Sequence, residues 1–161
     1  MVTMYKTHKK DLLPGCVLFN HVAYRDYRGE FSPMFNTDEF SEYIRPGFLQ
    51  LNMARSCFGV VRGMHRQDQT KIVMPIEGEI FDVVLEPETG KWCGVKLNKL
   101  NALLIPPQYA HGYMVLSANA TVQYIVDKPW NQQEEETFKW NGYGINWPTQ
   151  IEVITSEKDG K

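Results

Sequence analysis

The chain has 161 residues, a length typical of one domain with a single hydrophobic core and short for two domains of ordinary size. Seventeen Lys and Arg residues oppose nineteen Asp and Glu residues, and the formal net charge of -2 excludes the basic surface that binds nucleic acid or an anionic membrane. Hydrophobic residues make up 43% of the sequence, which is too apolar for a disordered chain. We therefore expect one globular domain over residues 1–161.

Cysteine usage and the N-terminus both favour a cytoplasmic protein. Cys16, Cys57 and Cys93 are widely spaced, contain no Cys-x-x-Cys motif and are odd in number, so they cannot form a complete disulfide set. The first ten residues carry positive charge, but no apolar run follows that is long enough for a signal peptide or a membrane span. We expect a protein of a reducing compartment without a membrane partner.

Short β-rich runs, each closed by turn residues, recur along the chain and predict an antiparallel sheet. In chain order the predicted strands are residues 16–23, 71–76, 79–85, 102–105, 112–116 and 121–126. The one predicted helix covers residues 37–44, with Asn36 or Thr37 as its cap and its apolar side chains facing inward.

The breaks between these runs have the expected turn chemistry. Glu77-Gly78 is typical of a tight hairpin, and Pro106-Pro107 cannot continue a ladder of hydrogen bonds. Within residues 80–85 and 121–127 the side chains alternate, so we expect one face of each strand to be wetter than the other. Many short strands and few helices indicate an all-β fold, either a double-sheet jelly roll or a small barrel, whose interior can hold one ligand.

Two of the four histidines, His65 and His111, lie in contexts that suggest a site. Neutral imidazoles are common ligands of transition metals, so a metal-dependent cupin is one interpretation. A cupin-type metal site needs two histidines alternating on one strand together with a carboxylate, whereas Arg66 and Gln67 follow His65. The ligand set is incomplete, and we predict no metal.

Acid–base chemistry fits the same residues better. His65 can act as a base near neutral pH, Lys71 can stabilise an enolate oxygen, and the Tyr124 hydroxyl can return a proton from the opposite side of a cavity. The alternative is that such a histidine or tyrosine is a hydrogen-bonded packing residue, which is common in β-proteins. Spacing alone does not decide between the two. The three consecutive glutamates 134–136 are expected to form a solvated face or loop.

Ordered motifs along nearly the whole chain resemble the dTDP-4-dehydrorhamnose 3,5-epimerase family. The matching segments are Asp26-Tyr27-Arg28-Gly29-Glu30-Phe31, Gln50-Leu51-Asn52, Gly59-Val60-Val61-Arg62-Gly63-Met64-His65, Gly78-Glu79-Ile80-Phe81-Asp82-Val83, Ile105-Pro106, Ala110-His111-Gly112-Tyr113, Tyr124, Ile145-Asn146-Trp147-Pro148 and Ser156-Glu157-Lys158-Asp159.

The resemblance implies a cupin-like double-sheet jelly roll with one or two short helices, which works as a homodimer without metal or organic cofactor. It also implies that His65 is the base that takes the proton beside a 4-keto group, with Asp159 as the carboxylate that orients it and favours its protonated form. Lys71 would lie at the keto oxygen, and Tyr124 would return the proton. The residues implied to contact the nucleotide-diphosphate sugar are Arg28, Gln50, Asn52, Arg62, His111 and Trp130.

Several positions depart from the family pattern, and most of them concern the substrate. Pro33 stands where an acidic residue is usual, Trp130 replaces a tyrosine, Gly142 replaces an aspartate, and the loop from His65 to Lys71 is short. Asp159 lies two residues before the end of the printed sequence, so its pairing with His65 requires that the rest of the fold hold it.

These departures leave the substrate open. The expected reaction is inversion of carbon 3, carbon 5 or both in a nucleotide-diphospho-4-keto-6-deoxy sugar, by default dTDP-4-dehydro-6-deoxyglucose, in deoxysugar or polysaccharide biosynthesis. A GDP-, CDP- or UDP-linked keto sugar or a heptose is an alternative substrate. A metal-dependent cupin and a non-catalytic sugar-nucleotide binder are the alternative classes of protein.

Overall fold

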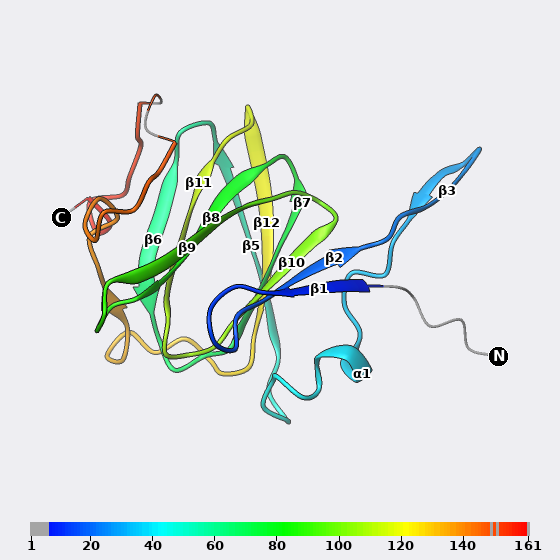
Figure 1. The fold of residues 1–161 in the computed structure, drawn as a ribbon, viewed down its shortest axis with the longest axis horizontal. Coiled ribbons are helices and arrows are strands. Elements are labelled where there is room, and N and C mark those ends of the chain that lie inside the picture. Colours follow the sequence, from blue (N-terminus) through cyan, green and yellow to red (C-terminus); the bar gives the residue numbers. More distant parts are fainter. Residues whose placement is uncertain (1–6, 149, 151, 161) are drawn as a thin grey trace.

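Two antiparallel β-sheets face each other in the computed structural model, which describes residues 7–148, 150 and 152–160 (Figure 1). The expectation that the first ten residues do not begin a signal peptide falls partly on residues 1–6, which lie outside the described residues. The six-stranded sheet consists, in spatial order, of β1 (Thr7–Asp11), β2 (Val17–His21), β10 (Asn101–Ile105), β7 (Lys71–Glu77), β12 (Asn119–Val126) and β5 (Gln50–Cys57). The five-stranded sheet consists of β13 (Glu136–Thr137), β6 (Val61–Arg66), β11 (Ala110–Val115), β8 (Ile80–Glu86) and β9 (Lys91–Leu97).

A small ribbon and one short helix complete the described fold. The ribbon pairs β3 (Tyr24–Asp26) with β4 (Gly29–Phe31) and projects away from the two sheets (Figure 1). The helix α1 (Thr37–Phe40) lies near the ends of the six-stranded sheet. Among the described residues, no helix is long and apolar enough to cross a membrane.

All six predicted strands are present, with ends that differ by at most two residues, and they form parts of both sheets. Gly78 joins β7 to β8 at a positive φ of +78°, as expected of a tight hairpin, and β10 ends just before Pro106. The predicted all-β fold is therefore confirmed, and the facing sheets favour the double-sheet architecture over a small closed barrel.

The predicted helix is too long. Asn36 is the cap, and its Oδ1 accepts a hydrogen bond of 2.7 Å from the backbone N–H of Glu39. Regular helix ends at Phe40, and residues 41–44 continue as turns and bends because Pro46 favours an extended conformation at the preceding residue and the chain heads for β5. Phe40 is fully buried against Phe19, with ring centroids 4.6 Å apart, so the inward direction of the apolar side chains is confirmed.

Three layers of apolar side chains hold the sheets in place. The central layer lies between the sheets and includes Val73, Val84, Leu103 and Val122. A second layer packs the segment 34–44 on the outer face of the six-stranded sheet. A third packs residues of the C-terminal segment on the outer face of the five-stranded sheet, namely Phe138, Trp140, Ile145, Trp147 and Val153. Burial of these surfaces supplies the main driving force for the fold.

Because of the third layer, the expectation that β8 has one wetter face is wrong. Strand β8 has no wet face, since five of its seven residues are buried and the others are half-buried, and Asp82 is 0% exposed. Alternation predicts a half-exposed strand only when one face of the sheet meets water. Here the C-terminal segment, with Ile145 and Trp147, covers the face that would otherwise be exposed.

The register of the strands brings the candidate residues to one region between the sheets. His111 on β11 lies directly opposite His65 on β6. On the facing sheet, Tyr124 on β12 lies between Asn52 on β5 and Val73 on β7. Residues directly opposite each other in an antiparallel ladder share a face of the sheet, so these side chains form two neighbouring groups.

Candidate active site

A cavity of about 270 Å³ lies between the two sheets and collects most of the predicted site residues. Its walls come from both sheets, from the loops that follow β6 and β12, and from the C-terminal segment. The lining residues are Ala54, Arg62, Gly63, His65, Gln67, Gln69, Lys71, Val73, His111, Tyr113, Val122, Tyr124, Trp130, Glu135 and Asp159.

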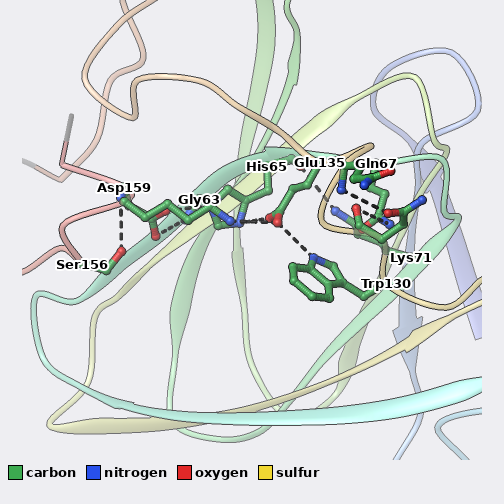
Figure 2. A network of polar contacts seen from close by, with 11 residues as sticks. Gly63, His65, Gln67, Lys71, Trp130, Glu135, Ser156 and Asp159 are labelled. Atoms are coloured by element: carbon green, nitrogen blue, oxygen red, sulfur yellow. Dashed lines mark hydrogen bonds and ion pairs between the residues drawn. The ribbon is translucent and has the colours of Figure 1, made fainter.

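His65 and Asp159 form a close pair at one side of this cavity (Figure 2). His65 Nε2 lies 2.7 Å from Asp159 Oδ1, and the histidine side chain is 28% exposed. A carboxylate can only accept hydrogen bonds, so this short contact requires the proton of the neutral imidazole to be on Nε2. The lone pair is then on Nδ1, the nitrogen of a potential base.

The fold holds Asp159 firmly, although it lies close to the end of the sequence. Its Oδ2 accepts a hydrogen bond of 3.2 Å from the backbone N–H of Gly63, and its own N–H donates to the Ser156 carbonyl at 3.1 Å. Further back, Ile154 pairs with the β6 side of the sheet by donating to Gly59 and accepting from Val61. Asp159 is only 5% exposed, so the condition for its pairing with His65 is met.

Burial decides the direction in which the pKa of His65 moves. Desolvation lowers the pKa below its usual 6.5, while the charges of Asp159 and Glu135 oppose that change without cancelling it. The expected preference of Asp159 for the protonated imidazole is present, but it is the smaller effect. His65 is therefore neutral, as a base must be, at neutral pH.

Lys71 brings a positive charge into the same cavity. It opens β7, and its Nζ donates a hydrogen bond of 3.3 Å to the backbone carbonyl of His65. Desolvation lowers its pKa to about 8, against the opposing charges of Glu135 and Asp82. The ammonium group is charged at neutral pH and poorly solvated, so it interacts strongly with an oxyanion.

Tyr124 reaches the cavity from the six-stranded sheet, while His65 reaches it from the five-stranded sheet. Burial raises the pKa of Tyr124, and the nearby Arg62 guanidinium partly counteracts this. The phenol keeps its proton at neutral pH and can donate it. A neutral imidazole and a protonated phenol thus enter the cavity from opposite walls.

Of the predicted sugar-nucleotide contacts, Arg62, His111 and Trp130 line the cavity, but Gln50 and Asn52 do not. Asn52 lies opposite Tyr124 in the ladder and accepts a hydrogen bond of 2.6 Å from Gln50 Nε2. These two residues are therefore next to the cavity, on the edge strand β5, and do not line it.

His111 belongs to a second imidazole–carboxylate pair. Its Nε2 lies 2.9 Å from Asp82 Oδ2, and the Asp82 side chain is completely buried. Desolvation raises the pKa of Asp82, while the nearby His111 and Lys71 oppose this rise. Sequence reasoning did not find Asp82, because an acidic residue within an alternating strand is usually solvent-facing.

Arg28 lies far from the other predicted residues. It is at the tip of the β3–β4 ribbon that projects from the sheets, and its guanidinium binds the Asp26 carboxylate, with Nε 3.1 Å from Oδ2. The described structure does not bring Arg28 into this chain's own cavity.

The three glutamates 134–136 were expected to form a solvated face or loop, and this is correct for the exposed Glu134 and Glu136 but wrong for the solvation of Glu135. Its side chain is only 11% exposed and lies at the centre of the contacts in Figure 2. One oxygen is 3.5 Å from His65 Nδ1, and the other accepts hydrogen bonds from Trp130 Nε1 at 2.9 Å and from Lys158 Nζ at 2.8 Å. The loop that follows β12 turns this one glutamate inward. Its neighbour Glu136 instead pairs with Arg66 on the outside. No signal in the sequence distinguishes the two.

The donor set does not favour the metal-dependent alternative. Each cavity histidine is engaged with its own aspartate, and in the described part of the chain no three His, Cys, Asp or Glu residues converge as metal ligands. Two facing sheets with a neutral imidazole, a buried ammonium and a phenol around one cavity define an all-β protein with a site for proton transfer on a small molecule.

Comparisons with known proteins agree with this class. The sequence pattern of the family described as dTDP-4-dehydrorhamnose 3,5-epimerase matches residues 10–161. The dTDP-4-dehydrorhamnose 3,5-epimerase of Pseudomonas aeruginosa is 37% identical over 161 residues, which cover 91% of this chain and 89% of that protein. The chain belongs to the dTDP-4-dehydrorhamnose 3,5-epimerase family and is an epimerase of the isomerase class.

Solved structures support the same assignment. The dTDP-6-deoxy-D-glucose-3,5-epimerase of Legionella pneumophila, in complex with dTDP-4-keto-L-rhamnose, has a TM-score of 0.88 and 31% identity and covers 96% of this chain and 90% of its own. The dTDP-4-dehydrorhamnose 3,5-epimerase of Sulfolobus tokodaii has a TM-score of 0.84 and 33% identity, with coverage of 95% and 92%. The predicted family, fold class and class of enzyme are confirmed.

The pairing of His65 with Asp159 can be tested without substrate. In Asp159→Asn the negative charge that favours the imidazolium is lost, while Gly63 and Ser156 can still hold the side chain and backbone. We expect the pKa of His65, followed by NMR, to fall further below that of the wild type. The matched control is Asp38→Asn in the exposed first turn of α1, which should leave it unchanged. An unchanged His65 pKa in Asp159→Asn would contradict the pairing.

Proposed function

We propose that the chain, acting as a single domain over residues 1–161, inverts carbon 3, carbon 5 or both of a dTDP-4-keto-6-deoxy sugar without metal or organic cofactor. The default substrate is dTDP-4-dehydro-6-deoxyglucose, and the reaction would belong to deoxysugar or polysaccharide biosynthesis. The names of the relatives and the keto sugar bound in the Legionella pneumophila structure support this substrate class. The observation that carries the proposal is that His65 and Tyr124 line the cavity from opposite sheets. Lys71 lines the same cavity, where the charges of Glu135 and Asp82 act on it.

His65 starts the reaction by removing the proton from the carbon beside the 4-keto group. The Nδ1 lone pair accepts this proton, and Asp159 and Glu135 stabilise the imidazolium that forms, since their carboxylates lie 2.7 Å and 3.5 Å from the two ring nitrogens. The electron pair of the broken C–H bond moves to the keto oxygen and makes an enolate. The Lys71 ammonium stabilises that oxyanion more strongly than the neutral ketone, which lowers the barrier.

Tyr124 completes the inversion from the other face. Its hydroxyl gives a proton to the carbon of the enolate, the C=O bond forms again, and a phenolate is left on Tyr124. Because acid and base lie on opposite walls, the new C–H bond points the other way from the old one. His65 has gained a proton and Tyr124 has lost one, so exchange with water resets the site after each turnover.

Arg62, His111 and Trp130 are proposed to bind the nucleotide-diphosphate part, with Gln50 and Asn52 close by on β5. A guanidinium matches the geometry of phosphate oxygens, and the exposed Trp130 ring at the rim offers a flat apolar surface. Trp130 is also tied to the catalytic cavity through its hydrogen bond to Glu135.

The first experiment is incubation with dTDP-4-keto-6-deoxyglucose in deuterated water with EDTA, with deuterium uptake at carbons 3 and 5 followed by NMR. We expect EDTA-resistant uptake at one or both carbons. The variant His65→Ala should lose at least about 10²-fold in exchange rate while still binding the nucleotide sugar, because general-base catalysis contributes about 10²–10⁴-fold. The exposed His8 on β1 provides the control, and His8→Ala should exchange at the wild-type rate.

The alternatives give different results in this experiment. Binding without exchange would indicate a non-catalytic binder or a different keto sugar, and GDP-, CDP- and UDP-linked sugars would then be tested. Loss of exchange in EDTA would indicate the metal-dependent class. Wild-type exchange in His65→Ala would show that His65 is not the base.

The pH dependence of kcat/KM should be bell-shaped. His65 must be neutral, and since burial lowers its pKa, activity should persist below pH 6.5 before it falls. Lys71 must be charged, so activity should fall as the pH rises through about 8. In Lys71→Arg the guanidinium stays charged, and the alkaline decline should move to higher pH even if the maximal rate is lower. An alkaline decline that stays near pH 8 in this variant would assign it to another group.

A homodimer is proposed as the working form. The outer face of β5, an edge strand, exposes Leu51 and Met53 at 58% and 66%, next to the apolar layer that contains Ile125. Arg28 lies on a ribbon outside this chain's cavity, and we propose that it contacts the substrate in the cavity of a second copy. We propose that a second copy covers this face.

Light scattering should therefore give twice the chain mass of 18.7 kDa. Met53→Asp should shift the protein toward the monomer, because it places a charge in the proposed apolar contact. Lys96→Asp on β9, an exposed position of the other sheet, should leave the mass unchanged. A monomeric wild-type protein would exclude this proposal.

We further propose a cytoplasmic location. Its support is that Cys16, Cys57 and Cys93 all remain free thiols in the structure, as expected in a reducing compartment.

A further inference from the structure

Tyr113 is a second phenol of the cavity, and the mechanism above does not use it. It lies on β11, two residues after His111, and is only 5% exposed. Its hydroxyl oxygen is buried and forms no hydrogen bond of normal geometry with any described residue. The nearby Tyr109 is equally buried, but its hydroxyl donates a hydrogen bond of 2.9 Å to the Pro14 carbonyl.

A buried hydroxyl without a partner costs stability, and a phenylalanine at the same position would avoid this cost. In the described structure the Tyr113 hydroxyl has no hydrogen bond of normal geometry that would offset the cost of its burial. Such a group is expected where a partner is charged or present only during the reaction.

The surroundings of Tyr113 show which partner that is. Burial raises its pKa to about 12, and the groups that act on it from nearby are Arg62, Asp82, Tyr124 and Ser56. Asp82 lies directly opposite Tyr113 on β8, with Oδ2 bound by His111 and Oδ1 buried without a hydrogen-bond partner of its own. Arg62 is a cation and can only donate, and the Ser56 hydroxyl accepts a hydrogen bond of 2.9 Å from its Nε; neither group changes charge in the proposed reaction. Tyr124 alone among these neighbours changes charge in the proposed reaction.

The two phenols have complementary properties. Tyr113 holds its proton at any pH of interest and can act only as a donor toward an anion. Tyr124 becomes a phenolate when it gives its proton to the sugar, and it does so in a half-buried site where burial opposes the charge. A donor that is already in place beside the forming anion stabilises the transition state without reorganisation.

We propose that Tyr113 is a positioning residue that acts through Tyr124, by donating its hydroxyl hydrogen bond to the Tyr124 oxygen as that oxygen becomes a phenolate. This rests on the proposed function, in which Tyr124 is the acid. The proton of Tyr113 is not transferred. The proton of Tyr124 goes to the sugar carbon, its O–H electron pair stays on the Tyr124 oxygen, and the Tyr113 O–H shares that negative charge until water reprotonates Tyr124.

The test is Tyr113→Phe, which removes only the hydroxyl. In deuterated water we expect hydrogen exchange started by His65 to stay within about twofold of the wild type and inversion to fall about tenfold. Tyr124→Phe should show the same pattern more severely, because it removes the proton donor itself.

A second readout needs no substrate. With tyrosine labelled by ¹³C at Cζ, the NMR titration of Tyr124 should have its midpoint about one pH unit higher in Tyr113→Phe than in the wild type, since the phenolate has lost a donor. Tyr109→Phe is the matched control. It should lower the melting temperature by a few degrees through the lost bond to Pro14 and leave the Tyr124 midpoint and the inversion-to-exchange ratio unchanged.

The outcomes separate this proposal from the proposed function. A wild type that exchanges no keto sugar would refute the proposed function, and the Tyr124 titration would still decide whether the two phenols are coupled. An unchanged Tyr124 midpoint in Tyr113→Phe would overturn the proposal. So would a shift confined to His111, which would make Asp82 the partner, or a lower melting temperature with an unchanged inversion-to-exchange ratio, which would make the role of Tyr113 structural.

Discussion

The hydrogen bond between Asp159 and His65 is the interaction on which the rest of the site depends. It joins residues 94 positions apart, fixes the ring so that Nδ1 carries the lone pair, and anchors the C-terminal segment against β6 through Gly63. The same segment covers the outer face of the five-stranded sheet. The C-terminal segment thus both packs against the sandwich and orients the His65 ring.

Low polarity inside the sandwich gives the groups of the cavity their chemistry. Burial lowers the pKa values of His65 and Lys71 and raises those of Tyr113 and Tyr124. The histidine is then a free base, the lysine is an ammonium with few waters, and both phenols keep their protons. At a surface site water would solvate the ammonium of the same lysine and weaken its interaction with an oxyanion.

Exceptions to the alternation rule mark the functional parts of the fold. Strand β5 exposes Leu51 and Met53, while Asn52 and Ala54 are half-buried and Ala54 lines the cavity, the reverse of an ordinary half-buried strand, and sequence reasoning did not predict it. Strand β8 buries Asp82, whose carboxylate pairs with His111. Where a sheet borders a ligand cavity, polar and apolar side chains both face inward, so a pattern based on an apolar core fails there.

The sequence by itself determined the all-β fold, six strands, the tight hairpin at Gly78 and the family, because turn chemistry and ordered motifs are local signals. It also singled out His65, Lys71, Tyr124 and Asp159, which line one cavity and whose roles stay predictions. Only the tertiary structure decided that Glu135 and not Glu136 turns inward, that Asp82 and Tyr113 are buried beside the cavity, and that Arg28 lies outside it. These facts depend on strand register and on which segment covers which face, and both arise from contacts between residues far apart in the chain.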